Sequence, residues 1–195
     1  MKEKREILSD YHKPWTNIHL QRHNHSLFTN FERESSYLIA QDAINCGAVR
    51  RYAEPFVDVE QWMLNNCKFC KHSTDNADHI FNGKCTVIWS IWQKCKSLYW
   101  TTTQQKLCIS SKVILNNDVK DGKNNYMALK LVVLTKNIIL YEKRLLDKYK
   151  TFIENKALFI NKVFQKIKHQ YMFALRNNAV LVRGASSSFW ELLPT

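Results

Sequence analysis

Four potential metal ligands lie within nineteen residues of this chain, at the spacing Cys-x2-Cys-x8-His-x5-Cys. They are Cys67, Cys70, His79 and Cys85, and Gly83 allows the chain to bend between the last two. Three thiolates and one imidazole form a standard tetrahedral set for structural Zn²⁺, and four protein ligands leave no open coordination position. The sequence therefore predicts one structural zinc ion per chain and no catalysis at the metal.

Two nearby residues offer alternative ligands. His72 could replace His79, and Cys95 could replace Cys85. His72 is almost adjacent to Cys70, which strains a shared tetrahedron, and Cys95 lies on the apolar face of a predicted helix. The other interpretation of the pattern is a set of unrelated thiols, some of them buried as small hydrophobic side chains.

The compartment decides how the cysteines are interpreted. The chain begins Met-Lys-Glu-Lys-Arg-Glu, without the apolar segment of a signal peptide behind it. Lys130 and Lys136 interrupt the most apolar stretch before it reaches the length of a membrane span. We therefore expect an intracellular protein of the nucleus or cytoplasm, not secreted and without a membrane partner, whose clustered Cys and His bind metal. Cys46 and Cys108 are expected to be structural.

Composition and apolar periodicity favour helices. Only 4 Gly and 3 Pro leave few turns for an all-β fold, and 45% hydrophobic residues are enough for a core. A capping box at Thr29–Glu32 starts one helix. Apolar residues at helical spacing predict others at Ile88–Tyr99, 125–149 and 151–176. We predict a mainly α protein in which a small Cys3His zinc knuckle is inserted in a helical domain and followed by two long C-terminal helices.

The predicted domain organisation rests on one polar stretch. Residues 101–125 are rich in Asn, Thr, Ser and Lys, and so long a connection is unusual inside a compact domain. The predicted segments are a polar N-terminal segment (1–28), a helix with the zinc-binding module (29–100), a linker (101–125), a basic two-helix region (126–178) and a flexible tail (179–195).

Positive charge is concentrated in the second half of the chain. The formal net charge is +12, and residues from Thr101 onward hold 16 Lys and Arg against 6 Asp and Glu. This asymmetry favours an anionic partner, the backbone of RNA or DNA, although a lysine-rich surface can also serve solubility alone. Trp89 is a candidate for stacking on bases, whereas Trp92 is expected in the core. The candidate phosphate contacts are Arg50, Arg51, Lys68, Lys71 and Lys84 near the zinc and Lys156, Lys162, Lys166 and Lys168 on the last helix.

The cluster and its surroundings resemble a known family. An acidic residue before the His, apolar residues after it and a Trp four positions after the last Cys are similar to the reverse transcriptase zinc-binding domain. That domain lies near the C-terminus of LINE-type (non-LTR) retrotransposon polyproteins. The resemblance implies a module that helps a polymerase domain, in cis or in trans, to hold template RNA or target DNA. The matching residues are Cys67, Cys70, Asp78, His79, Ile80, Phe81, Cys85 and Trp89.

No catalytic motif accompanies the cluster. The chain has no adjacent Asp pair of a polymerase, no His-Glu-x-x-His, no nucleophile elbow and no Gly-rich phosphate loop. We therefore expect no enzyme but a zinc-binding, nucleic-acid-binding accessory module, derived from the C-terminal part of a retrotransposon reverse transcriptase. The alternative is a structural or protein-interaction zinc domain, which is favoured if the Lys and Arg side chains are scattered over the surface.

Overall fold

A computed structural model confirms the prediction of a mainly helical protein. The described residues are 28–40, 66–71, 75–81, 83–110, 113–114, 117, 119 and 125–177. They form no sheet. Their helices are α3 (Asn30–Ala40), α6 (Ala77–Phe81), α7 (Thr86–Thr103), α9 (Asn125–Lys148) and α10 (Lys156–Arg176).

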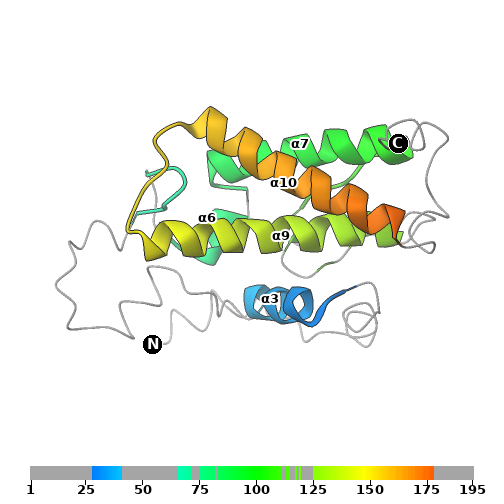
Figure 1. Cartoon of the computed structure of the whole chain (residues 1–195), viewed down its shortest axis with the longest axis horizontal. Helices are drawn as coiled ribbons and strands as arrows, with labels where there is room; N and C mark the ends of the chain where they lie inside the picture. Colours follow the sequence, from blue (N-terminus) through cyan, green and yellow to red (C-terminus); the bar gives the residue numbers. More distant parts are fainter. Residues whose placement is uncertain are drawn as a thin grey trace.

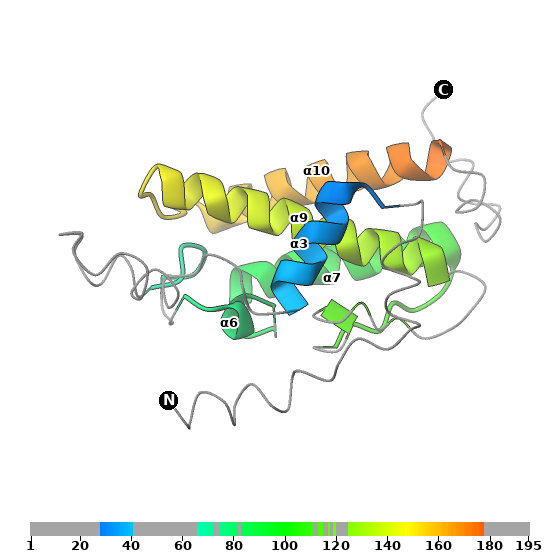
Figure 2. The same ribbon diagram turned by 90° about the horizontal axis from the view of Figure 1, so that it is seen from below.

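The central helix is α9. It packs against α3 on one side and against α7 and α10 on the other (Figure 1). In the view turned by 90°, α3 lies across α9 (Figure 2). Helices α7 and α10 also pack against each other. The short α6 lies toward the end of the bundle where α7 and α10 begin and α9 ends.

The sequence of α9 explains its position. Every residue from Met127 to Leu140 is buried, and a helix that is apolar on nearly all sides must pack on several partners. Tyr141 follows the apolar spacing of the helix predicted at 125–149, but it is not a core residue, because its side chain is 51% exposed and lines a surface cavity. None of the helices in the described part of the chain has the length and apolar content needed to cross a membrane.

The start of α3 confirms the predicted capping box. Thr29 Oγ1 accepts a hydrogen bond from Glu32 N at 3.2 Å, and Thr29 N donates to Glu32 Oε2 at 2.8 Å. The two side chains therefore satisfy two backbone N–H groups at the helix start.

The last helix starts later than predicted. Residues 151–155 are not helical, and α10 begins at Lys156 after Asn155, whose side chain accepts a hydrogen bond from Leu158 N at 2.9 Å. This cap fixes the helix start. The apolar pattern from residue 151 was misleading because Ile153 is buried without being helical.

The segment predicted as a linker contributes several of its described residues to the core. Leu107, Val113, Ile114 and Val119 are buried, and they belong to the same apolar cluster as residues of α7, α9 and α10. The predicted segment boundaries stay predictions, but the residues on the two sides of this segment share one core.

Two lysines of α9 form buried ion pairs across the fold. Lys130 Nζ donates to both carboxylate oxygens of Glu32, at 2.7 and 2.8 Å. Lys143 Nζ donates to Asp75 Oδ2 at 2.8 Å and to Asp147 Oδ2 at 2.9 Å. Pairing with carboxylates offsets the cost of removing each ammonium from water. The first pair ties α3 to α9, and the second ties the segment before α6 to α9.

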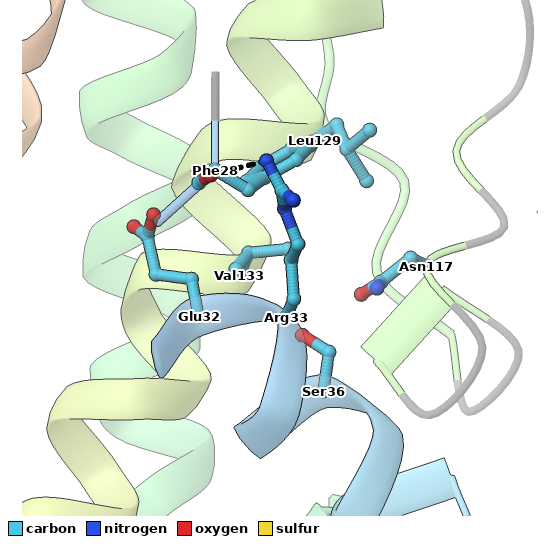
Figure 3. Close-up of a pocket in the computed structure, with 7 residues that line it drawn as sticks. All are labelled: Phe28, Glu32, Arg33, Ser36, Asn117, Leu129 and Val133. Carbon is cyan, nitrogen blue, oxygen red and sulfur yellow. Dashed lines mark hydrogen bonds between the residues drawn. The ribbon is translucent and has the colours of Figure 1, made fainter. Parts of the chain in front are cut away.

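A third lysine of α9 is buried against a neutral group. Lys136 Nζ donates to Asn117 Oδ1 at 2.7 Å, and burial lowers the pKa of Lys136 to about 7. Asn117 also lines a small cavity of about 10 Å³ between α3 and α9 (Figure 3), which is close to the space that one water molecule needs. Arg33 Nη2 donates to the Phe28 carbonyl beside it, at 3.0 Å.

Candidate metal centre

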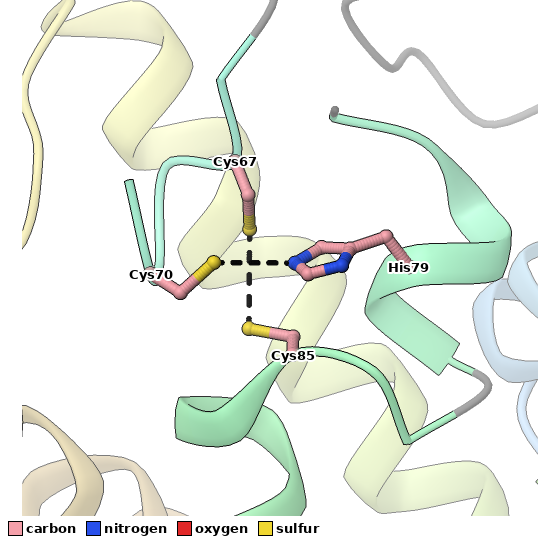
Figure 4. Close-up of side chains that lie close together, drawn as sticks. All are labelled: Cys67, Cys70, His79 and Cys85. Atoms are coloured by element: carbon pink, nitrogen blue, oxygen red, sulfur yellow. Dashed lines mark hydrogen bonds between the residues drawn. The ribbon is translucent and has the colours of Figure 1, made fainter. Parts of the chain in front are cut away.

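The structure brings the four predicted ligands together (Figure 4). Their ligand atoms all lie within 4.8 Å of one another, and all four side chains are buried. Cys67 Sγ lies 3.9 Å from Cys85 Sγ, and Cys70 Sγ lies 3.2 Å from His79 Nε2. Zinc bonds of about 2.3 Å to sulfur and about 2.0 Å to nitrogen, arranged as a tetrahedron, separate two sulfurs by about 3.8 Å and sulfur from nitrogen by about 3.5 Å. The observed separations are close to these values.

The first two ligands lie on a tight turn. Lys71 N donates to the Cys67 carbonyl at 2.9 Å, and Lys71 has a left-handed φ of 69°. The turn directs the thiols of Cys67 and Cys70 toward the same point (Figure 4).

The second pair of ligands is positioned by α6 and the bend after it. Asn76 Oδ1 accepts a hydrogen bond from His79 N at 2.7 Å, which caps α6. Gly83 has φ 78°, so the bend predicted at this residue is confirmed. A Cβ atom at Gly83 would lie 3.2 Å from Trp89 Cε3. Cys85 N donates to the His79 carbonyl at 3.0 Å, which closes the loop between them.

The last of the four ligands lies at the start of α7. Cys85 is the N-cap residue of α7, and its carbonyl accepts from Trp89 N at 2.8 Å. A metal bound to the Cys85 thiol would therefore fix the start of α7. Trp92, one turn further, is completely buried, as predicted, whereas Trp89 is 36% exposed.

A bound cation would change the ionisation of the thiols in the cluster. The pKa of the Cys67 thiol is raised, first by its hydrogen bond with Cys85 and then by burial. A divalent cation reverses this effect, because it stabilises the thiolates directly. Sulfur and imidazole ligands suit zinc and exclude the oxygen-seeking Ca²⁺ and Mg²⁺. The buried Cys3His cluster could hold one metal ion, and zinc is the ion that these ligands favour.

The remaining cysteines do not join the cluster where they are described. Cys95 is buried in the core, as expected, and its Sγ lies 3.5 Å from Thr135 Oγ1. Cys108 is exposed, so the expectation of a structural role has no support from packing. Cys46 and the alternative ligand His72 lie outside the described residues.

The knuckle is attached to the turn between α9 and α10. The Lys68 carbonyl accepts from Ile153 N at 3.4 Å, and Lys68 Nζ lies 4.4 Å from the centroid of the Phe152 ring. The rings of Phe69 and Phe159 are 5.8 Å apart. Together with the ion pair of Lys143, these contacts link the metal centre to both C-terminal helices.

Three of the predicted phosphate contacts are occupied within the protein. Lys68 is wrong as a surface contact, because it is only 5% exposed and packs on the turn before α10. Lys84 forms an ion pair with Asp78, and Lys166 forms one with Glu142. The pair of Lys84 is exposed and therefore weak, so a phosphate could compete with it, whereas the Glu142 carboxylate that holds Lys166 is buried.

The other candidates are exposed or lie outside the description. Arg50 and Arg51 are not among the described residues. The exposed candidates are Lys71, Lys156, Lys162 and Lys168.

Sequence reasoning missed the residue that ties the knuckle to α9. Asp75 is buried and pairs with Lys143, which lies 68 positions further along the chain. The neighbouring sequence gave no signal of this pair, because Lys143 lies in the charged C-terminal stretch of α9, between Glu142 and Arg144.

The comparisons with known proteins leave the family open. The chain matches no protein-family model, no curated protein and no solved structure. The similarity to the reverse transcriptase zinc-binding domain stays a prediction from the residues around the cluster.

Proposed function

We propose that this chain is a structural zinc module that binds the backbone of RNA or DNA, and that it derives from the C-terminal part of a retrotransposon reverse transcriptase. The observation that carries the proposal is the buried Cys3His cluster. Its last ligand, Cys85, begins α7, and Phe69, which lies between the first two ligands, packs on Phe159 of the strongly basic helix α10. One zinc ion per chain would fold the knuckle, because the free energy of metal binding is folding free energy here.

The basic helix is α10. It contains Lys156, Lys162, Lys166, Lys168 and Arg176 and no Asp or Glu. Three of these lysines are exposed without an acidic neighbour on their own helix. Positive side chains of this kind bind phosphates without sequence preference and release counterions when they do.

The absence of polymerase and hydrolase motifs from the sequence supports an accessory role. We propose that the chain has no catalytic activity of its own and acts with a polymerase domain in cis or in trans. A nuclease and primer-extension assay with added Mg²⁺ or Mn²⁺ tests this. Turnover that survives purification to homogeneity would refute it.

Nucleic-acid binding is tested by fluorescence anisotropy with labelled RNA and DNA over a salt series. The variant Lys156→Gln/Lys162→Gln removes two charges from α10, and Lys96→Gln/Lys106→Gln removes two from α7 and the segment after it. If α10 holds the phosphates, the first variant should lower the slope of log K against log salt by about 2, with little change for the second.

A second candidate function is a structural or protein-interaction domain. The observation in its favour is that Lys68 is buried and that Lys84 and Lys166 are paired with acidic residues. Zinc at one equivalent without measurable affinity for RNA or DNA at low salt would favour this function over the first. Equal losses of affinity in the two double variants would argue against a nucleic-acid site on α10.

A further inference from the structure

We propose that the cavity between α3, α9 and α10 holds a base of a single-stranded nucleic acid. This inference rests on the proposed function and deepens it, because backbone contacts alone do not distinguish paired from unpaired strands. The cavity encloses about 510 Å³ and is open to the surface. That volume lies in the usual range of small-molecule sites.

Two exposed aromatic rings stand at the cavity on different helices. Phe31 of α3 is 48% exposed, and Tyr141 of α9 is 51% exposed. Each has a cation close to its ring. The Arg144 guanidinium lies 5.9 Å from the Phe31 centroid, and Lys166 Nζ lies 5.6 Å from the Tyr141 centroid. Exposed rings are the usual platform for stacked bases of single strands. Arg144 is exposed and can attract the phosphates, whereas Lys166 is already paired with Glu142.

An unsatisfied amide lies beneath the same cavity. Asn137 is 6% exposed, and in the described part of the structure neither its Nδ2 nor its Oδ1 has a hydrogen-bond partner. Buried amides are nearly always hydrogen-bonded. An amide offers one donor face and one acceptor face, and the edges of the bases carry the complementary groups side by side.

The helical spacing places these groups together. Leu134, Asn137 and Tyr141 are separated by three and four positions and so share one face of α9, and Gln170 follows Lys166 by one turn on α10. The Gln170 side chain is exposed and also lines the cavity.

The acidic residue that lines the cavity does not oppose an anionic strand strongly. Glu32 lines the cavity, but both of its carboxylate oxygens accept hydrogen bonds from Lys130. Its charge is therefore compensated inside the protein. A base is a better occupant than an apolar peptide side chain, because a side chain would leave the Asn137 amide unsatisfied.

The test uses the full-length zinc-loaded chain and two labelled strands of equal length, an oligothymidylate and an abasic strand with the same phosphates. The variants are Phe31→Ala and Tyr141→Ala, and the control is Phe173→Ala, which removes an even more exposed ring of α10 that does not line the cavity. A third variant, Asn137→Leu, removes the amide and keeps the volume similar.

We expect the wild type to prefer the oligothymidylate to the abasic strand. Phe31→Ala and Tyr141→Ala should each weaken oligothymidylate binding by about 10-fold, which is typical for loss of one stacked ring. They should not change binding of the abasic strand, and Phe173→Ala should change neither. Asn137→Leu should also weaken oligothymidylate binding while it remains folded by circular dichroism.

Two results would overturn the inference, and they differ in their meaning. Equal affinity for the two strands, unchanged in the variants, would retain backbone binding and remove the base site. Absence of binding to either strand at low salt would remove the proposed function together with the site.

Discussion

Replacing Cys85 by serine tests the metal centre most directly. Cys85 supplies one of the four clustered ligand atoms and begins α7. Structural zinc contributes about 10–16 kcal/mol in small zinc domains at neutral pH, which is comparable to the whole stability of a domain, about 5–15 kcal/mol. A serine hydroxyl is a much weaker ligand than a thiolate for a metal that selects sulfur. Cys85→Ser should therefore unfold the knuckle rather than only weaken it.

The matched control is Cys95→Ser on the same helix. Cys95 is equally buried, and its Sγ lies close to the Thr135 hydroxyl. A serine there keeps a hydrogen-bonding partner, so the loss should be about 1 kcal/mol, or roughly 2–4 °C in Tm for a chain of this size.

The zinc content, the near-ultraviolet circular dichroism and the free energy of unfolding of each variant together decide the outcome. Elemental analysis should give one zinc per wild-type and Cys95→Ser chain and much less for Cys85→Ser. The near-ultraviolet circular dichroism of the buried Trp92 should be lost in Cys85→Ser and in the wild type after chelation. If the two serine variants lose the same stability, or if the wild type is folded and cooperative without metal, the metal centre is not what holds this fold.

Three smaller perturbations test separate parts of the structure. Lys136 has a pKa of about 7 in the folded state against about 10.4 in the unfolded state. Between about pH 7 and about pH 10 the unfolded state therefore binds more protons than the folded state, so the free energy of unfolding should rise with pH in this range. The rise is up to about 2 kcal/mol from pH 7 to pH 9, and urea titrations of Lys136→Met should lack it. Asn155→Ala removes the cap of α10 and should cost about 1 kcal/mol, measured by thermal unfolding, with Asn161→Ala as the control for an exposed site within the helix. Gly83→Ala places a side chain on a residue with left-handed backbone, beside the Trp89 ring, and should lower the free energy of unfolding by about 1–2 kcal/mol. A competition titration with a zinc chelator should then show weaker metal retention. Unchanged retention would contradict the role given to the bend.

The metal centre was predictable because its chemistry is local in the sequence. The four ligands lie within nineteen residues, and few ligand sets match a tetrahedral ion so fully. The fold class followed from the same kind of local pattern, since apolar residues at helical spacing mark α7 and α9 directly. The capping box at Thr29–Glu32 is local too, and it forms as predicted.

Contacts between distant positions could not be predicted in this way. Lys130 pairs with Glu32 across 98 positions, and Lys143 with Asp75 across 68. The residues next to each lysine do not indicate which acidic residue it pairs with, because the fold and not the local sequence brings the two partners together. The prediction of where α10 starts was wrong for a related reason. Ile153 is buried because it contacts the knuckle region and not because it belongs to a helix.

The buried lysines change what the net charge means. The basic excess after Thr101 includes Lys130, Lys136 and Lys143, all of which are directed into the protein. Positive charge counted from the composition is therefore larger than the charge that the C-terminal half presents to a partner. Among the described residues after Thr101, most of the exposed Lys and Arg side chains lie on α10, on the C-terminal end of α9 and on the turn between them. A strand bound there meets a narrow row of cations, so the salt dependence should correspond to about two to four phosphates and not to the full excess. A much steeper dependence would place the contact surface on residues outside those that the structure describes.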